Sequence, residues 1–330
     1  MRKFLFALPV WLMLSPFASA QCAGHDLRET LTSAERDRLD ALLAEMPYPA
    51  GNHWRAEKDG EVIHLVGTMH LSDPRLEAPL ERLRPVVRDA GALLLEMPRA
   101  QEKQLQAAVT TQPDLLFLSD ATLPELMDEE DWQALSKAAK AHGIPPFMAA
   151  KFRPWYLSMM LSMPACAQEA LQEQNGFDKQ LETVAENMGV PTVALEPYDA
   201  AFAIFNAEPV EDQIEMMTAS LAAEKQGEDS FATTIAAYFD EEAGEMWHMA
   251  QILLERQDTF TAEEAAEVME ESGEALLAQR NRAWIPVILK TADKAGKPIV
   301  AAFGAAHLPG EEGVLNLLAE EGFTLTREPF

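Results

Sequence analysis

The chain has 330 residues, of which 48% are apolar, and it carries a formal net charge of −28 at pH 7. This length is sufficient for one large α/β domain or two smaller ones. A surface with this much negative charge repels nucleic-acid phosphates and anionic lipid headgroups. We therefore exclude nucleic acid as a partner. The simplest role of the charge is to keep the protein in solution.

The first twenty residues, MRKFLFALPVWLMLSPFASA, have the pattern of a secretory signal peptide. A basic start is followed by an apolar run and small residues, which predicts cleavage after Ala20. The run is too short for a membrane anchor, and two prolines interrupt it. A lipid anchor on Cys22 is disfavoured because the bulky Gln21 precedes it. We therefore expect a mature chain of residues 21–330, periplasmic or secreted, with no stable membrane anchor after signal cleavage.

The mature chain contains two cysteines, Cys22 and Cys166. In an oxidising compartment an even number of thiols favours a disulfide bond, which would tie the new N-terminus to the middle of the chain. The alternative is two unpaired thiols. A cysteine nucleophile is not expected, because neither residue has a histidine close to it in the sequence.

The predicted elements begin with helices alternating with strands. In chain order we expect a helix at residues 32–45 that starts with a capping box of Thr32 and Glu35, and a hairpin at 52–67 with its turn at Lys58-Asp59-Gly60. These are followed by a helix from residue 74, a strand at 92–98, helices near 129–142 and 153–163, and a helix ending at Gly189 before a strand at 190–195. The segment ALLLEMP is apolar throughout, as is typical of a parallel strand that is buried on both faces.

The second part of the chain is mainly helical. From about residue 200 to residue 295 the sequence is rich in Met and acidic residues and shows no strand pattern. A strand at PIVAAFG, a helix at 312–321 and a last strand at FTLTR follow. We predict an α/β fold: one domain with a central mixed, largely parallel sheet flanked by helices, and a helical insertion or cap subdomain at about 200–295.

Two strands end in the same motif. EVIHLVGTMHL leads to His70 and PIVAAFGAAHL leads to His307, each through Gly-x-x-His-Leu. Glu96 and Glu196 follow two further predicted strands. Parallel strands deliver such residues to one edge of the sheet. Two histidines and a carboxylate suit a divalent-metal site with open positions, or metal-free general acid–base chemistry.

The segments HLVGTMHLSD, LLLEMP, NGFDKQL…VALEP, QRNRAW and AAFGAAHLPGEEGVLNLLAEEGFTLTR resemble the TraB/GumN family, which is related to the TIKI-type secreted metalloproteases. The resemblance covers nearly all of the mature chain and is strongest in the two Gly-x-x-His blocks. It implies a site of His70, Glu96, Arg280 with Asn281, and His307. It also implies metal-dependent peptide-bond hydrolysis, with Mn²⁺ or Co²⁺ rather than a tightly held structural Zn²⁺ as cofactor.

The surrounding polar residues have alternative roles. Arg280 could hold a substrate carboxylate or an oxyanion, or form a salt bridge that orients one of the glutamates. Asn281 could donate to a polarised carbonyl or cap a turn. Asp178 is expected to cap the start of its helix and, like Glu196, to support the ligand residues. Glu196 could hold the second nitrogen of a ligand histidine, and Thr68 is expected to bond within its own turn.

Two functions follow from these observations. The first is an exported metal-dependent hydrolase, peptidase-like, that acts on a peptide or protein substrate through the two histidines and Glu96. The second is a non-catalytic protein that uses the same rim to bind a metal, haem or peptide. A metal-free ester or amide hydrolase is a third possible function, with less support than the other two. We expect His64 to be a buried strand residue, and the remaining histidines to lie outside the site: His25, His53, His142 and His248.

Overall fold

The computed structural model describes residues 22–330 apart from 23, 168–169, 171–172, 223–226 and 257–260. The predicted signal peptide, residues 1–20, lies outside the described residues. In the part of the chain that the structure covers, each helix is too short or too polar to cross a lipid bilayer.

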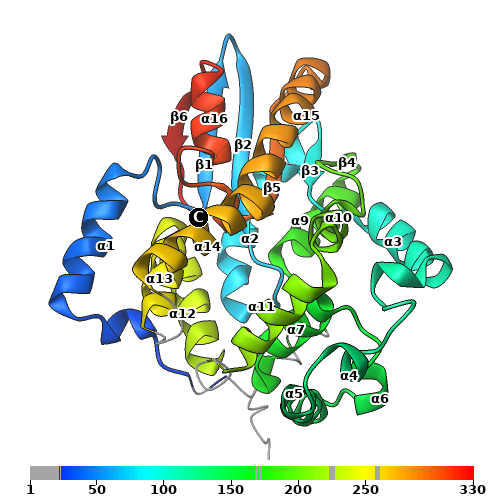
Figure 1. Cartoon of the computed structure of the whole chain (residues 1–330). Helices are drawn as coiled ribbons and strands as arrows, with labels where there is room; N and C mark the ends of the chain where they lie inside the picture. Colours follow the sequence, from blue (N-terminus) through cyan, green and yellow to red (C-terminus); the bar gives the residue numbers. More distant parts are fainter. Residues whose placement is uncertain (1–21, 23, 168–169, 171–172, 223–226, 257–260) are drawn as a thin grey trace, which may run out of the picture.

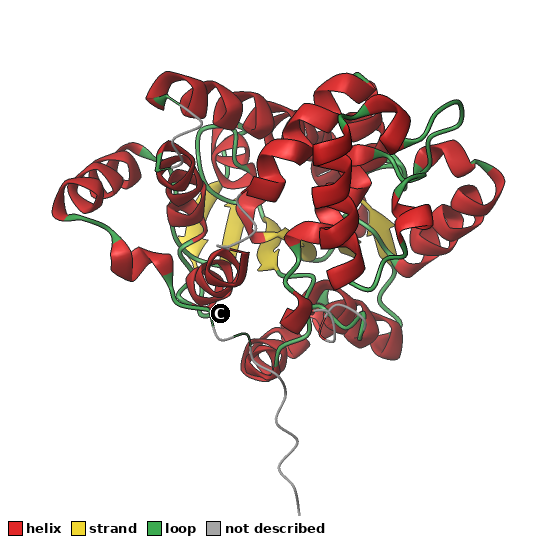
Figure 2. Ribbon diagram, turned by 60° about the horizontal axis from the view of Figure 1, so that its bottom comes forward, coloured by secondary structure: helices red, strands yellow, loops and turns green. Residues whose placement is uncertain are grey.

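The centre of the molecule is one sheet (Figures 1 and 2). Its described strands are β1 (His53–Lys58), β2 (Glu61–Thr68), β3 (Leu93–Leu95), β4 (Thr192–Ala194), β5 (Ile299–Gly304) and β6 (Thr324–Arg327), in the order β4-β3-β5-β2-β1-β6. The strands β4, β3, β5 and β2 are mutually parallel, while β1 is antiparallel to both of its neighbours. The predicted mixed, largely parallel sheet is therefore confirmed.

The β1–β2 hairpin has the predicted turn. Lys58 pairs with Glu61 across a two-residue loop of Asp59 and Gly60. Both loop residues have positive φ, 51° and 92°. That backbone matches the right-handed twist of the strands, and Asp-Gly is among the sequences that adopt it most readily.

Helices cover both faces of the sheet. On one face, Leu94, Ala301 and Phe303 pack against α15 (Gln279–Ala295) and α16 (Val314–Glu320). On the other face, Leu93, Leu95, Val300 and Ala302 pack against α2 (Glu77–Asp89) and α9 (Phe177–Met188). Because successive side chains of a strand point to opposite faces, a strand buried on both sides must be apolar at every position. This explains the unbroken apolar runs of the sequence.

A helical layer lies beyond the carboxyl edge of the parallel strands (Figure 1). Its described helices are α3 (Arg99–Thr111), α4 (Leu123–Leu126), α5 (Glu129–Ala141), α6 (Pro146–Ala149), α7 (Pro154–Ser162), α10 (Ala200–Ala207), α11 (Val210–Ala222), α12 (Gly227–Phe239), α13 (Ala243–Glu255) and α14 (Ala262–Gly273). A separate apolar cluster, which includes Leu135, Leu157 and Met217, holds α5, α7 and α11 together.

The helices α14 and α15 are joined by a π-helical segment, Glu274–Ala278, without an interruption of the helix. The resulting rod starts in the helical layer and ends against the sheet, where Trp284 and Ile288 are fully buried. π-helical turns inside α-helices are rare and are frequent at functional sites. This one ends two residues before Arg280.

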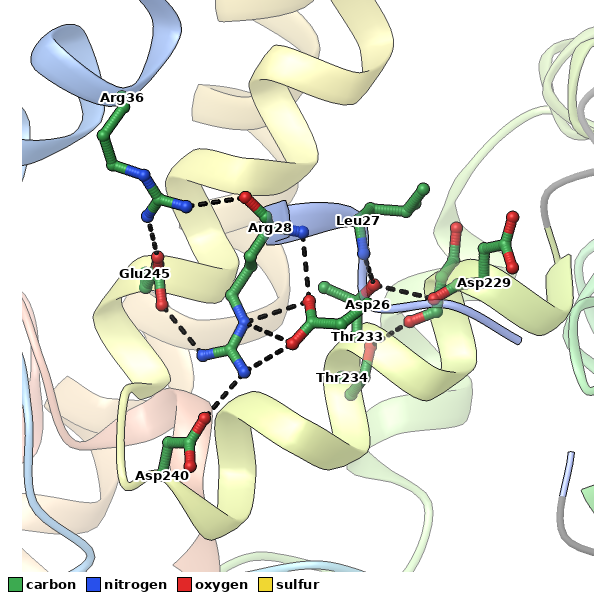
Figure 3. A network of polar contacts seen from close by, with 10 residues as sticks. Asp26, Leu27, Arg28, Arg36, Asp229, Thr233, Thr234, Asp240 and Glu245 are labelled. Atoms are coloured by element: carbon green, nitrogen blue, oxygen red, sulfur yellow. Dashed lines mark hydrogen bonds and ion pairs between the residues drawn. The ribbon is translucent and has the colours of Figure 1, made fainter. Parts of the chain in front are cut away.

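The N-terminal segment is bound to the helical layer (Figure 3). The Arg28 guanidinium contacts Asp26, Asp240 and Glu245, and Arg36 reaches the second oxygen of Glu245 at 2.9 Å. The next helix, α1 (Ser33–Glu45), packs on α13 through Leu39 and Met249.

A disulfide bond joins Cys22 to Cys166. The predicted pairing is therefore present, and both cysteines are engaged. It connects Cys22, near the start of the described residues, to the segment between α7 and α9.

Candidate functional site

The carboxyl edge of the parallel strands gathers the predicted site residues. Glu96 directly follows β3, and Glu196 comes two residues after β4. His70 comes two residues after β2, and His307 ends a short 3-10 helix that follows β5. Since these strands run in the same direction, their ends meet at a single edge.

Arg280 is the centre of this cluster. Its Nε and Nη2 donate to the two oxygens of Glu196 at 2.9 and 2.6 Å, and Nη2 also donates to Glu96 Oε2 at 2.5 Å. Its Nη1 donates to the carbonyl of Leu276 in the π-helical segment at 3.1 Å. Of the alternatives for Arg280, the structure shows the salt bridge, and it involves both glutamates.

His307 is held in one tautomer by a chain of hydrogen bonds. Asn281 Nδ2 donates to the Glu312 carbonyl at 2.7 Å, so Asn281 Oδ1 must face the imidazole. His307 Nδ1 lies 2.6 Å from this oxygen and therefore carries the proton. Its Nε2 keeps a lone pair, which accepts from Arg280 Nη1 at 3.2 Å. The imidazole is 4% exposed and lies against the Trp284 ring.

His70 has a different environment from His307 although the two motifs are alike. Its side chain is 62% exposed, and its Nδ1 lies 3.3 Å from Asp178 Oδ1. Gly176 allows the start of α9 to lie against the His70 backbone, because a Cβ at this position would lie 2.5 Å from the His70 carbonyl carbon. The start of α9 can therefore approach the chain closely enough for Phe177 N to donate to Met69 O at 2.8 Å.

The glycines of the two motifs also act differently. A Cβ on Gly67 would lie 2.8 Å from the Leu308 side chain and 3.0 Å from Ala305 Cβ, so this glycine admits the segment that carries His307. Gly304 has room for a Cβ, but its backbone N–H donates to Glu96 Oε1 at 2.6 Å. Each Gly-x-x-His block thus helps to place a residue of another strand.

A small pocket opens beside this cluster. Thr68, His70, Glu96 and Asp178 supply its polar lining, and Leu95 and Phe303 supply part of its apolar lining. The Thr68 hydroxyl is buried and has no hydrogen-bond partner among the described residues. A buried polar group without a partner carries a desolvation cost, and such groups often serve a function.

The electrostatics separate the two histidines. Burial lowers the pKa of His307 to about 4, so this imidazole is neutral at pH 7. The hydrogen bond to Asp178 raises the pKa of His70 to about 9, so His70 is a cation. Burial opposes ionisation of Glu96, but His307, His70 and Arg280 together lower its pKa, and it is a carboxylate.

The candidate ligands do not form a ready metal site. Both oxygens of Glu96 and both nitrogens of His307 are engaged, by Gly304, Arg280 and Asn281. Within the described ranges, no three His, Cys, Asp or Glu side chains are grouped so as to hold a metal ion. The donor set as arranged therefore does not fit the expected divalent ion.

Three expectations about supporting residues are corrected. Asp178 does not cap α9, whose N-cap is Gly176 without a side-chain bond, because Asp178 turns to His70 instead. Glu196 holds Arg280 and the Trp284 indole rather than a histidine. The Thr68 hydroxyl has no hydrogen-bond partner among the described residues, those of its own turn included.

The histidines outside the motifs have other surroundings. His64 is half-buried, and its Nδ1 lies 3.1 Å from Nε2 of His53, which is buried. His142 bonds to the Ala138 carbonyl of its own helix.

Sequence reasoning did not single out Trp284, whose indole N–H donates to Glu196 at 3.0 Å, or the Leu276 carbonyl. Trp284 could have been found from its place in the segment QRNRAW, next to Arg280 and Asn281. Nothing in the sequence marks the π-helical turn.

The family model described as TraB/PrgY/gumN family matches residues 52–327 of the 330. Neither a curated protein nor a solved structure matches the chain. The matched range runs from the residue before β1 to the end of β6, and it includes every residue of the cluster.

Proposed function

Because this chain belongs to the TraB/PrgY/gumN family, we propose that it is an exported metal-dependent hydrolase that cleaves peptide bonds at the rim of its sheet. The observation that carries the proposal is the pocket beside the Arg280 cluster. Around one small space it places an ionised carboxylate, a histidine cation and a hydroxyl that no described residue bonds. Hydrolysis of an amide requires a base, an acid and a donor for the carbonyl oxygen.

The roles of the pocket residues follow from their protonation states. Glu96 is held by Arg280 and Gly304, and its carboxylate accepts the proton of the attacking water. The His70 imidazolium, supported by Asp178, donates a proton to the leaving amine. The Thr68 hydroxyl is free to donate to the substrate carbonyl. Without the ion, Arg280 holds Glu96, and Asn281 fixes the tautomer of His307.

Export of the protein is supported by the bond between Cys22 and Cys166. Disulfides persist in oxidising compartments such as the periplasm or the cell exterior and are rare in the cytosol. The signal-peptide pattern at the start of the chain agrees with this location.

The cofactor in this proposal is a divalent ion, Mn²⁺ or Co²⁺, with Zn²⁺ as an alternative. When bound, such an ion would acidify a water and polarise a carbonyl. Glu96 and His307 would have to exchange their present partners in order to bind it, because their donor atoms are occupied.

The test is metal analysis of the purified mature chain, followed by turnover of a mixed peptide library with and without Mn²⁺ or Co²⁺. Cleavage products should form with the wild-type chain. Glu96→Gln and His70→Ala should abolish them, and both variants should melt cooperatively. His142→Ala is the control, because this ring bonds within its own helix.

The alternative is a protein that binds a metal, haem or peptide at the same rim without cleaving it. Saturable binding of a library peptide with no product, in the presence of each metal, would establish that function instead. Turnover that persists undiminished in Glu96→Gln would show that the rim is not the catalytic site.

A further inference from the structure

All five N–H groups of the Arg280 guanidinium are engaged. A guanidinium has five such donors, and the structure provides five acceptors. Two are the oxygens of Glu196, and one is Glu96 Oε2. The remaining two are the Leu276 carbonyl and His307 Nε2, both contacted by Nη1.

The acceptors are of the kind that bind divalent cations. Glu96 and Glu196 are carboxylates, and His307 presents the lone pair of a neutral imidazole whose other nitrogen is fixed by Asn281. Metal-binding histidines are held in this way in proteins, with one nitrogen on the ion and the other on a supporting acceptor. Carboxylate and imidazole groups together suit Zn²⁺, Mn²⁺ and Co²⁺.

We propose that Arg280 is an internal competitor for a divalent cation. Its guanidinium occupies the cation position between Glu96, Glu196 and His307, and a metal ion binds there only when the guanidinium withdraws. This inference rests on the proposed function, because it states how access of the cofactor to that site is regulated. It accounts for a cluster with the right donor types but without a free set of ligands.

Several features hold the guanidinium in this position. The Arg280, Glu96 and Glu196 side chains are 15, 13 and 9% exposed, so their charges are largely removed from water. The guanidinium also lies 5.0 Å from the centre of the Trp284 ring, within the range of a cation–π contact. The π-helical turn supplies the Leu276 carbonyl as a further acceptor.

The test compares metal binding by Arg280→Met and by the wild-type mature chain. Met has similar length but no charge and no donor, so it leaves the three acceptor side chains open. Each chain is stripped with chelator and titrated separately with Mn²⁺, Co²⁺ and Zn²⁺ in a calorimeter. We expect at least one ion to bind the variant about tenfold more tightly or better, and to restore the melting temperature that the variant loses in chelator.

Arg282→Met is the matched control. Arg282 lies on the same helix and also bridges two carboxylates, Glu274 and Glu312, but its side chain is 43% exposed. Its removal should leave metal affinity at the wild-type value. The double variant Glu96→Gln with Arg280→Met should lose the affinity gained by Arg280→Met.

Equal or weaker metal binding by a cooperatively melting Arg280→Met chain overturns the proposal, as does a gain that survives Glu96→Gln. If Arg280→Met does not fold, Arg280→Lys replaces it. The lysine ammonium has only three donors for the five acceptors, so it competes less well with a metal ion. The affinity of the Arg280→Lys chain for the ion should therefore exceed that of the wild type. Wild-type affinity in Arg280→Lys then overturns the proposal.

The outcomes separate this proposal from the proposed function. If the wild type cleaves peptides with metal but Arg280→Met shows no gain in affinity, the competitor role fails and the hydrolase stands. If Arg280→Met gains affinity but peptides are not cleaved by the wild type under any metal, the hydrolase fails and the competitor role stands.

Discussion

Thr68 shows how a single residue can be unfavourable for stability and useful for function. Its hydroxyl is buried at the end of β2, lines the pocket and has no partner among the described residues. In the free protein it therefore lowers stability, because its hydration is lost and not replaced. A bound substrate could supply the missing partner.

We predict that Thr68→Val raises the stability of the free protein by up to about 1 kcal/mol while it lowers peptide turnover. Val has nearly the same shape and removes only the unsatisfied group. Thermal melting and library turnover measure the two effects. Thr68→Ser keeps the hydroxyl and should retain more activity than Thr68→Val. A Thr68→Val chain destabilised by 2 kcal/mol or more would show that the hydroxyl has a structural partner.

Asn281 decides the tautomer of His307, since its amide lies between the imidazole and the Glu312 carbonyl. We predict that Asn281→Ala lowers the free energy of unfolding by about 2–4 kcal/mol, because the buried His307 imidazole and the partly buried Glu312 carbonyl lose their partners. Urea denaturation measures the loss. Nitrogen NMR of His307 should also show that the proton no longer resides on Nδ1 alone.

Asn316→Ala is the control for that measurement. Asn316 is a half-exposed residue of α16 that bonds to the Glu311 carbonyl, and its loss should change stability by less than about 0.5 kcal/mol. An unaltered His307 tautomer in Asn281→Ala would contradict the role of Asn281.

At the scale of elements, the β1–β2 hairpin contains a pair of neutral histidines that holds the C-terminal segment. His53 Nδ1 lies 3.0 Å from the Pro329 carbonyl and must donate to it, so His53 Nε2 accepts from His64 Nδ1. Burial lowers the pKa of both rings, that of His64 to about 4, and the charge of Arg55 acts on His64 in the same direction. Glu328 and Glu241 oppose the shift of His53.

This pair predicts a loss of stability in mild acid. The folded pKa of His64 lies below the unfolded value of 6.5, so the unfolded chain binds more protons and stability rises with pH. The contribution is complete above pH 6.5 and is lost as the pH falls towards 4. From pH 7 to pH 5 we expect His64 to account for a loss of about 1–2 kcal/mol, measured by urea denaturation as the difference between the wild type and His64→Gln.

His64→Gln should remove the part of that dependence that His64 contributes, because glutamine does not titrate, while the part that arises from the low pKa of His307 should remain. His25→Gln is the control, since His25 is exposed and should leave the dependence unchanged. An identical slope of stability against pH in His64→Gln and in the wild type would show that the acid sensitivity arises elsewhere.

At the scale of the whole molecule, the N-terminal segment ties distant parts of the chain together. Arg28 and Arg36 bind it to Asp240, which follows α12, and to Glu245 of α13, and Cys22 binds it to the segment that precedes α9. The helix α9 in turn carries Asp178, the partner of His70. The disulfide bond thus joins the N-terminal segment to the part of the chain that leads into α9.

We predict that the double variant Cys22→Ala with Cys166→Ala lowers the free energy of unfolding by about 3–5 kcal/mol. The bond closes a loop between residues 144 positions apart, and long loops restrict the unfolded chain most. Urea denaturation measures the change. Alkylation of the unreduced protein should label neither cysteine, and labelling of both would show that the bond is absent in solution.

Local sequence patterns determined the helices and strands, and they determined the edge of the sheet at which the site residues meet. Apolar runs such as LLLEMP indicate strands buried on both faces, and parallel strands bring Glu96, Glu196 and the two Gly-x-x-His blocks to one edge. The capping box of Thr32 and Glu35, the Asp59-Gly60 turn and the Gly189 helix end are short-range effects, and they were predicted correctly.

Only the tertiary structure decided how the site residues are paired. Two identical motifs became an exposed cation at His70 and a buried neutral ring at His307, because Asp178 meets one and Asn281 the other. Arg280 satisfied both glutamates from a helix that lies far from them in the sequence. Such pairings depend on which elements pack together in three dimensions, and the spacing of residues along the chain does not encode them.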